Sequence, residues 1–363
     1  MFYGRKTKQT FGKERTDLIR FECDYNMGAA PQVLERLLLT NMEQTPGYSL
    51  DPYCAKAVQM IRDMVGRQEA EVHFLSGGTQ TNATVIGALL RPYQGVLCSD
   101  LAHINVHETG AIEATGHKVL PLPSVEGKIT AKQIADYVDA HWADDVHDQM
   151  VQPGMVYLSN STEVGTIYTK AELEAISAVC REKGLYLYVD GARLGYALMA
   201  EGNDLTMFDL SRLCDVFYIG GTKQGALFGE AIVICNQALQ RDFRYMIRRI
   251  GGLLAKGRLF GLQFLALLEE GLYFKMSQHA NQQAMRIKAK LQEKGIAFQC
   301  DSPTNQQFVI FPNEALAELT KNFAISNNGP WDETHTLIRF CTSWATKTED
   351  VDALLAELDR IFS

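Results

Sequence analysis

The sequence lacks the features that mark nucleic-acid-binding, membrane-spanning and disulfide-rich proteins. Its 35 lysines and arginines are outnumbered by 43 aspartates and glutamates, and the formal net charge of −8 argues against a nucleic-acid partner. No apolar run is long enough to cross a bilayer. The 8 cysteines are scattered without a CxxC pair, which indicates reduced thiols and a cytoplasmic location. No metal site is expected.

Two nucleotide-binding signatures are also missing. The Walker pattern GxxxxGK[ST] and the dinucleotide pattern GxGxxG do not occur at the glycine-rich turns, so an NTPase and a nucleotide-dependent oxidoreductase are disfavoured. Residues 1–20 are rich in Lys and Arg but have no apolar core. We therefore expect an N-terminal arm there and no secretion signal.

Short apolar runs alternate with helical patterns over residues 21–250. This alternation predicts an α/β fold in which a mostly parallel sheet of about seven strands is covered by helices on both faces. Sites in such folds lie at the carboxyl ends of the strands. The strands are expected at Val72–Leu75, Val96–Cys98, Val156–Leu158, Leu185–Val189, Val216–Ile219 and Ala231–Cys235, with helices at Gln80–Leu90, Ala131–Trp142 and Ala171–Lys183.

The pattern changes after about Gly251. A long amphipathic stretch, Leu253–Tyr273, is followed by shorter elements, including an expected strand at Thr336–Thr342 and a closing helix at Thr348–Ile361. We predict a large domain over residues 21–250 and a smaller C-terminal α+β domain over residues 251–363.

Three turns that follow predicted strands carry polar residues. Asp190 ends a buried strand, where an aspartate more often caps the next helix. Lys223 follows a second strand and the turn Gly220-Gly221-Thr222, where an exposed loop lysine is the ordinary alternative. The turn that contains Gly78 and Thr79 leads from a strand into a helix, which makes it either an anion site or a plain helix cap.

Together the three turns fit one cofactor, pyridoxal 5′-phosphate (PLP). This cofactor needs a phosphate cradle, a lysine that holds it as a Schiff base, and a carboxylate beside its pyridine nitrogen. The chain has all three groups after predicted strands: Gly78 and Thr79 for the phosphate, Lys223 for the Schiff base and Asp190 for the carboxylate.

With these motifs, the chain from about Phe21 to its C-terminus resembles the threonine aldolase and β-eliminating lyase family of fold-type I PLP enzymes. It is most similar to the phenylserine aldolase branch in the stretches STEVGTIY (161–168), GTKQG (221–225) and RFCTS (339–343). The resemblance implies a PLP-dependent transferase-like fold and an amino-acid substrate.

The resemblance also implies roles for individual residues around the cofactor. Lys223 would form the Schiff base, and Asp190 would pair with the pyridine nitrogen. Gly78 and Thr79 would bind the phosphate. His103, which would otherwise be taken for a core or surface histidine, would stack on the ring.

Other implied roles concern the substrate and a neighbouring subunit. Arg193 would lie near the cofactor and the substrate carboxylate, and Arg339 would clamp that carboxylate. Tyr48 would reach the site of a neighbouring subunit to contact the substrate. Lys256 would lie over the partner's phosphate, although a basic residue there is usually just solvated. These roles imply a homodimer or homotetramer with sites at the subunit interface.

The sequence departs from typical threonine aldolases at two places. The stretch Ser159–Glu163 has no second active-site histidine, and Cys23 stands where a carboxylate-binding serine is usual. The first departure is shared with the phenylserine branch. The general base is therefore left open between Glu163, His103 and an ordered water.

The resemblance implies cleavage of the Cα–Cβ bond of a β-hydroxy-α-amino acid, of the L-threonine, L-allo-threonine or phenylserine type, to glycine and an aldehyde. The alternatives are a PLP-dependent β-eliminating lyase, such as a dehydratase or a carbon–sulfur lyase, an aminotransferase, and a non-catalytic PLP-binding protein. The bond that is broken distinguishes the first three.

Overall fold

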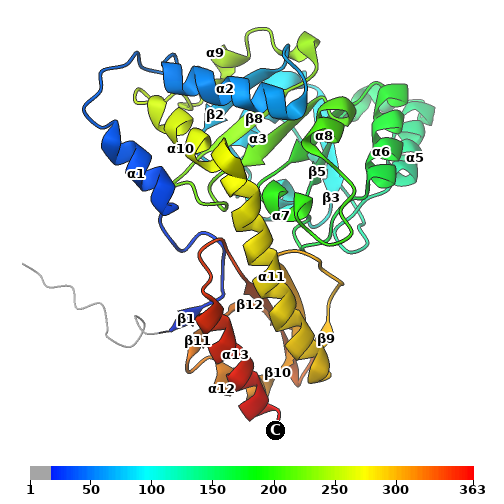
Figure 1. Ribbon diagram of the computed structural model, residues 1–363. Helices are drawn as coiled ribbons and strands as arrows, with labels where there is room; N and C mark the ends of the chain where they lie inside the picture. The colour runs from blue at the N-terminus through cyan, green and yellow to red at the C-terminus, as the bar shows by residue number, and fades with distance from the viewer. Residues whose placement is uncertain (1–17) are drawn as a thin grey trace, which may run out of the picture.

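A seven-stranded sheet forms the centre of the larger part of the structure, a computed structural model in which residues 18–363 are described (Figure 1). The strand order is β2-β8-β7-β6-β5-β3-β4, and β8 runs in the direction opposite to the other six strands. The predicted mostly parallel sheet is confirmed. The strands are β2 (Glu71–Leu75), β3 (Gln94–Ser99), β4 (Val119–Leu122), β5 (Gln152–Ser159), β6 (Tyr186–Asp190), β7 (Val216–Gly220) and β8 (Glu230–Ile234).

Alternate side chains of each strand point to opposite faces of the sheet, and both faces are apolar. In β6, Leu187 and Val189 belong to one core cluster and Tyr188 to the other. The first cluster includes side chains from α1 (Pro31–Leu39), α2 (Pro52–Val65), α5 (Ala131–Ala143), α6 (Lys170–Lys183), α8 (Met207–Leu213) and α10 (Arg258–Leu268). The second includes α3 (Gly78–Leu89), α4 (His103–Val106) and α9 (Phe243–Arg249).

Local sequence explains where several helices begin and end. Thr130 and Thr169 accept a hydrogen bond from the third helical N–H of α5 and α6, and the Gln133 and Glu172 side chains bond back to the capping residues. Helix α6 ends at Gly184, whose φ of 70° lies in the left-handed region that glycine adopts without strain.

The amphipathic stretch predicted at Leu253–Tyr273 is divided in the structure. Helix α10 ends at Leu268, and Glu270 (φ 55°) and Gly271 (φ 67°) take left-handed conformations before α11 (Leu272–Glu293) begins. Two consecutive left-handed residues redirect the chain, because an α-helix cannot continue through them. The long helix α11 runs from the region of the large sheet into the C-terminal part (Figure 1).

The C-terminal part is built on an antiparallel four-stranded sheet of order β12-β13-β10-β9. The strands are β9 (Ala297–Phe298), β10 (Gln306–Pro312), β12 (Ser326–Pro330) and β13 (His335–Cys341), and the helices are α12 (Asn313–Leu319) and α13 (Thr348–Ile361). The predicted final strand and helix are confirmed. The short strand β1 (Ile19–Arg20) pairs with β11 (Phe323–Ala324), so the first described residues also pack here.

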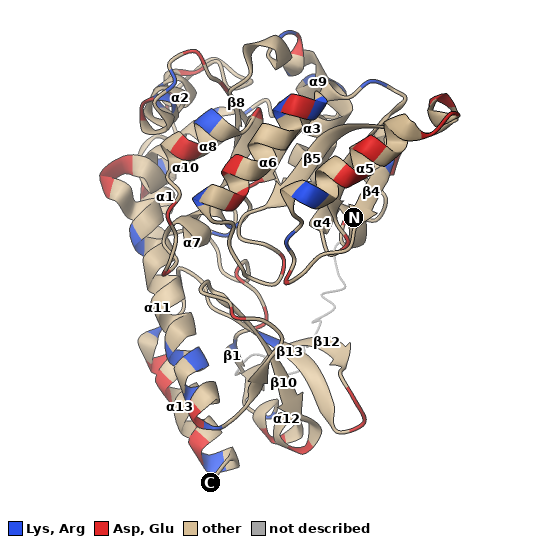
Figure 2. Cartoon of the chain, turned by 90° about the vertical axis from the view of Figure 1, so that its right-hand side faces the viewer, with Lys and Arg blue, Asp and Glu red and all other residues tan. Residues whose placement is uncertain are grey.

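The predicted domain limits stay a prediction. Helix α10 packs against α1 and α2, whereas α11 contacts both α7 (Leu194–Leu198) and α13. Residues 1–17 of the predicted N-terminal arm lie outside the described residues. Within residues 18–363, no helix is long and apolar enough to cross a membrane. Figure 2 shows acidic and basic residues side by side along α5, α6 and α13. The cytoplasmic location stays a prediction.

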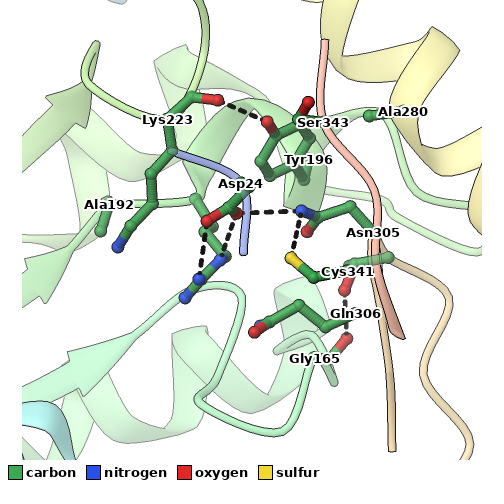
Figure 3. Close-up of polar contacts among 12 residues, drawn as sticks. Asp24, Gly165, Ala192, Tyr196, Lys223, Ala280, Asn305, Gln306, Cys341 and Ser343 are labelled. Atoms are coloured by element: carbon green, nitrogen blue, oxygen red, sulfur yellow. Dashed lines mark hydrogen bonds and ion pairs between the residues drawn. The ribbon is translucent and has the colours of Figure 1, made fainter. Parts of the chain in front are cut away.

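A buried ion pair joins segments that are far apart in the sequence. Asp24 accepts hydrogen bonds from Nε and Nη2 of Arg193 at 2.7 and 3.0 Å, and from Nδ2 of Asn305 at 3.0 Å (Figure 3). Arg193 follows β6 of the large sheet, and Asn305 directly precedes β10 of the C-terminal part. Asp24 therefore links the N-terminal segment, the large sheet and the C-terminal part.

Replacement of Asp24 by Asn should destabilise the fold strongly. Burial by itself raises the pKa of Asp24, but the charges of Arg193 and Lys223 and the hydrogen bonds from Arg193 and Asn305 lower this pKa to about 2. Breaking such a buried pair leaves an uncompensated charge and costs about 3–5 kcal/mol. We expect this loss for Asp24→Asn in urea unfolding at pH 7.

The pH dependence provides the control. Because folding lowers the pKa of Asp24, the ionised carboxylate stabilises the fold at pH values above its unfolded-state pKa of about 4. This stability is lost as the pH falls from about 4 to about 2. The wild type should therefore lose more stability over this range than Asp24→Asn. Asp136→Asn, which breaks an exposed pair with Lys132, should leave the unfolding midpoint unchanged. Equal acid profiles for the wild type and Asp24→Asn would contradict the assignment.

Candidate active site

A cavity of about 250 Å³ lies at the carboxyl ends of β5, β6 and β7, where the sequence predicts a site. Helix α3, the first residue of α4 and the loop after β7 also contribute to its walls. The cavity brings together seven of the residues that the sequence singles out: Gly78, Thr79, His103, Glu163, Asp190, Arg193 and Lys223.

Asp190 ends β6 and is almost fully buried, yet its carboxylate is surrounded by donors. Oδ1 accepts from the hydroxyl of Tyr218 at 2.5 Å and from the N–H of Ala192 at 2.9 Å. Oδ2 accepts from the hydroxyl of Tyr157 at 2.6 Å and from Nδ2 of Asn82 at 3.1 Å. Burial and the neighbouring Asp190 charge raise the pKa of both tyrosines, so they remain donors. Four hydrogen bonds thus hold a negative charge at the cavity wall.

Glycine is required directly after Asp190 because two backbone segments meet there. A Cβ atom on Gly191 would lie 1.8 Å from the carbonyl oxygen of Tyr218 in β7. The absence of a side chain lets the turn after β6 pack against β7. This close approach brings Asp190 and the Lys223 loop to one cavity.

Lys223 lies in the loop that follows β7, and its backbone carbonyl accepts a hydrogen bond from the Tyr196 hydroxyl at 2.5 Å (Figure 3). Burial lowers the pKa of the Lys223 amine, and the nearby charge of Arg193 lowers it further. A lysine with a lowered pKa has a larger neutral fraction, which is the form that attacks a carbonyl carbon.

The N-terminus of α3 provides an anion cradle. Gly77 is the capping residue of this helix and supplies no side-chain cap, so the first helical N–H groups are not bonded by it. Gly78 and Thr79 begin the helix and line the cavity. Backbone N–H groups and the positive end of a helix together suit a phosphate group.

His103 belongs to a hydrogen-bonded chain that sequence reasoning missed. Its Nδ1 lies 2.7 Å from Oε1 of Glu108, a buried carboxylate. Asn82 donates through Nδ2 both to this Glu108 oxygen at 2.7 Å and to Asp190 at 3.1 Å. Asn82 stands one helical turn after Gly78, which is the only sequence signal that could have indicated it. The chain connects the imidazole to the carboxylate of Asp190.

Glu163 lines the cavity in the stretch that lacks a second histidine. Its Oε1 accepts from the Ser159 hydroxyl at 2.6 Å and from the backbone N–H of His103 at 2.8 Å. Burial raises the pKa of this carboxyl group, although the two hydrogen bonds act in the opposite direction. The Glu163 carboxyl group is therefore held at the cavity by one of its oxygens.

The two arginines that the sequence selects for the substrate carboxylate are differently placed. Arg193 lines the cavity while its Nε and Nη2 are bonded to Asp24. Arg339 lies on β13 outside the cavity lining, where Nη1 donates to Gln306 at 3.0 Å and Nη2 to the Glu22 carbonyl at 2.8 Å. Its Nε is buried and has no hydrogen-bond partner among the described residues.

Tyr48 and Lys256 do not line this cavity. Tyr48 packs under Arg248, with the guanidinium carbon 4.8 Å from the ring centre, and borders a separate surface hollow of about 410 Å³. Lys256 is exposed, and the neighbouring Ala255 carbonyl accepts a hydrogen bond from the Tyr48 N–H at 3.1 Å. The two residues thus lie near each other on the surface of the subunit.

The residues of the cavity fit PLP. Asp190 offers a fixed carboxylate for a protonated ring nitrogen, Lys223 offers an amine, and the start of α3 offers N–H groups to a phosphate. Fold and site together define a fold-type I PLP-dependent enzyme.

Comparisons with known proteins agree with this class. Residues 24–314 match the β-eliminating lyase family. A low specificity L-threonine aldolase of Pseudomonas sp. is 31% identical over 95% of this chain and 98% of its own length. The solved structure of Leishmania major threonine aldolase has a TM-score of 0.92 and 44% identity, and the match covers 95% of this chain and 99% of that chain. A Thermus thermophilus aspartate aminotransferase, 14% identical with a TM-score of 0.69 over 95% of this chain and 92% of its own, shares the fold alone.

The chain therefore belongs to the β-eliminating lyase family, and it is a PLP-dependent lyase. The family resemblance predicted from the sequence motifs is confirmed. The roles of the individual site residues stay predictions, supported by their positions.

Lys223→Ala should abolish turnover and the covalent attachment of PLP, because no other lysine within residues 18–363 lines the cavity. Borohydride reduction followed by peptide mass spectrometry should place the pyridoxyl adduct on Lys223 in the wild type and find none in the variant. Lys132→Ala, which removes an exposed lysine of α5 outside the cavity, is the control and should keep the adduct. An adduct at another lysine in the wild type would contradict the assignment.

Proposed function

We propose that the protein is an aldolase that cleaves the Cα–Cβ bond of a β-hydroxy-α-amino acid, such as L-threonine, L-allo-threonine or phenylserine, to glycine and an aldehyde. The observation that carries the proposal is the single cavity in which Lys223 and Asp190 lie together with Glu163 and His103. An amine, a ring-nitrogen partner and two candidate bases are the groups that this reaction needs. The names of the relatives from Pseudomonas and Leishmania support the same reaction.

The cofactor, when bound, supplies an electron sink for the pair released at Cα. Lys223 provides the amine that holds it. Asp190, fixed by four donors, keeps a proton on the ring nitrogen and so favours acceptance of that pair. His103 is positioned by Glu108, and its partly exposed ring forms part of the cavity wall.

Two arginines are candidates for binding the substrate carboxylate, Arg193 in the cavity lining and Arg339 on β13. The buried Nε of Arg339 lacks a partner among the described residues, and a carboxylate would satisfy it. Arg193 has Nε and Nη2 committed to Asp24. We therefore propose Arg339 as the main carboxylate ligand, with Arg193 adding charge from the cavity wall.

Removal of the β-hydroxyl proton requires a base. Glu163 and His103 both line the cavity, and Glu163 has only Oε1 engaged by Ser159 and the His103 N–H. A raised pKa brings a carboxyl group closer to the range that suits proton transfer near neutral pH. The geometry favours Glu163 as the base and leaves His103 and an ordered water as alternatives.

Product analysis should distinguish the proposed aldolase from its rivals. Incubation of the holoenzyme with L-threonine, L-allo-threonine and phenylserine should release glycine and the matching aldehyde in equal amounts. Ammonia and a keto acid would instead establish β-elimination, and pyridoxamine phosphate would establish aminotransfer. Glu163→Gln should lower kcat for cleavage at least about 100-fold if Glu163 is the base, and Glu163→Asp should recover part of it. Wild-type activity in Glu163→Gln would exclude that role.

We also propose that the protein is at least a homodimer whose interface includes α1 and the segment that follows it. Large apolar side chains are exposed there: Leu38 is 77%, Leu39 76%, Met42 89% and Leu50 67% accessible. An exposed apolar patch of this kind is typical of a subunit interface. Its continuity with Tyr48 supports a second copy as the occupant, because Tyr48 lies outside the cavity of its own subunit.

Light scattering should find a dimer or tetramer, and Leu38→Glu combined with Met42→Glu should shift it toward monomers. The control is Val125→Glu, since Val125 is equally exposed, at 78%, but lies in a turn away from α1. A monomeric wild type at micromolar concentration would contradict the proposal.

A further inference from the structure

Glu230 is a buried acid in the cavity to which the reaction assigns no role. It is the first residue of β8, and its exposed fraction is 3%. The register of the sheet pairs it with Leu75 at the end of β2 and with Gly220 at the end of β7. The turn after Leu75 leads to Gly78, and the turn after Gly220 leads to Lys223. Glu230 therefore lies between the proposed phosphate cradle and the lysine loop.

The carboxylate of Glu230 accepts hydrogen bonds from two groups of the loop that carries Lys223. Oε2 accepts from the N–H of Gly221 at 2.9 Å, and Oε1 accepts from the hydroxyl of Thr222 at 2.7 Å. The Thr222 oxygen in turn accepts from the N–H of Gly229 at 3.0 Å. A hydroxyl group has one proton to donate. Thr222 also lines the cavity, but in this arrangement its proton is committed to Glu230.

A bound phosphate would place a second anion close to this buried carboxylate. The charged and titratable groups around Glu230 are Lys223 and Asp190, together with the neutral hydroxyls of Tyr188, Tyr218 and Tyr273. Of these groups only Lys223 carries a positive charge, and one ammonium cannot balance both the Glu230 carboxylate and a phosphate dianion.

Glu230 is already close to its neutral form. Burial raises the pKa of this carboxyl group to about 7, against the opposing effects of the Thr222 hydrogen bond and the Lys223 charge. A neighbouring phosphate dianion would raise this pKa further, because a like charge disfavours ionisation. Proton uptake on phosphate binding is therefore the least costly way to relieve the repulsion.

We propose that Glu230 takes up one proton from water when the cofactor phosphate binds, and that this proton reverses the hydrogen bond between Glu230 and Thr222. The protonated carboxyl group donates to the Thr222 oxygen, which keeps its bond from Gly229. The Thr222 hydroxyl keeps its own proton, which no longer bonds to Glu230 and can therefore be donated in a hydrogen bond to the phosphate. Thr222 becomes a phosphate ligand only in this state. The inference concerns cofactor binding and holds whichever bond of the substrate is broken.

Calorimetric titration of the apoenzyme with pyridoxamine 5′-phosphate tests the proposed proton uptake by Glu230. This compound has the phosphate but forms no covalent bond to Lys223. Titration at pH 8 in two buffers of different ionisation enthalpy yields the number of protons taken up. The wild type should take up about 0.9 proton more than Glu230→Gln at pH 8 and about 0.1 more at pH 6. Glu230→Gln should bind about tenfold more tightly than the wild type at pH 8 and equally at pH 6.

Two controls isolate Thr222 and the phosphate. In a Thr222→Val background, Glu230→Gln should tighten binding at pH 8 less than it does with Thr222 present, because the repulsion remains but the hydroxyl that would donate to the phosphate is absent. Pyridoxamine without phosphate should show no difference in proton uptake between wild type and Glu230→Gln. Equal proton uptake by wild type and Glu230→Gln with pyridoxamine 5′-phosphate would overturn the proposal.

The wild type alone also tests the proposal if Glu230→Gln fails to fold. At pH 8, where the phosphate itself is fully ionised, the enzyme should take up nearly one proton more on binding pyridoxamine 5′-phosphate than on binding pyridoxamine. No excess would overturn the proposal. None of these measurements involves cleavage of an amino acid, so their failure is distinct from a failure of the proposed function.

Discussion

The parallel pairing of β5, β6 and β7, closed by antiparallel β8, is the constraint on which the site depends. The register places Ser159 beside Asp190 and Gly220 beside Glu230, so that the ends of four strands meet at one edge. Most of the cavity residues lie at one of these ends or in the turn that follows it, and most of the others follow β2 and β3. The antiparallel direction of β8 matters because it brings the start of that strand, and hence Glu230, to the edge where its neighbours finish.

Three buried carboxylates near this edge differ in how they are compensated. Asp24 has a bidentate arginine and an asparagine, and Asp190 has four hydrogen-bond donors and no cation in contact. Glu230 has a hydroxyl and one backbone N–H. The two better-compensated groups suit fixed charges, one for the fold and one for the ring nitrogen. The least compensated one is suited to change its protonation.

Sequence patterns were sufficient for the residues that directly follow a strand. Asp190, Lys223 and Gly78 stand at strand ends, and parallel strands bring such ends together whatever the details of packing. Residues that act through side-chain contacts were not accessible in the same way. Asn82, Glu108 and Tyr157 look like ordinary members of a helix, a loop and a strand. Only the packed structure shows that they meet Asp190 or His103.

The sequence by itself determined the α/β alternation, the three turns that fit PLP and the family resemblance, because these depend on local periodicity and short motifs. The tertiary structure decided the break between α10 and α11, the Asp24 link between distant segments, and the placing of Tyr48 and Lys256 away from the cavity of their own subunit. It also decided which acids are buried and by what they are surrounded. The break lies at two adjacent left-handed residues, whereas the other properties depend on contacts between segments far apart in the sequence, which no local pattern encodes.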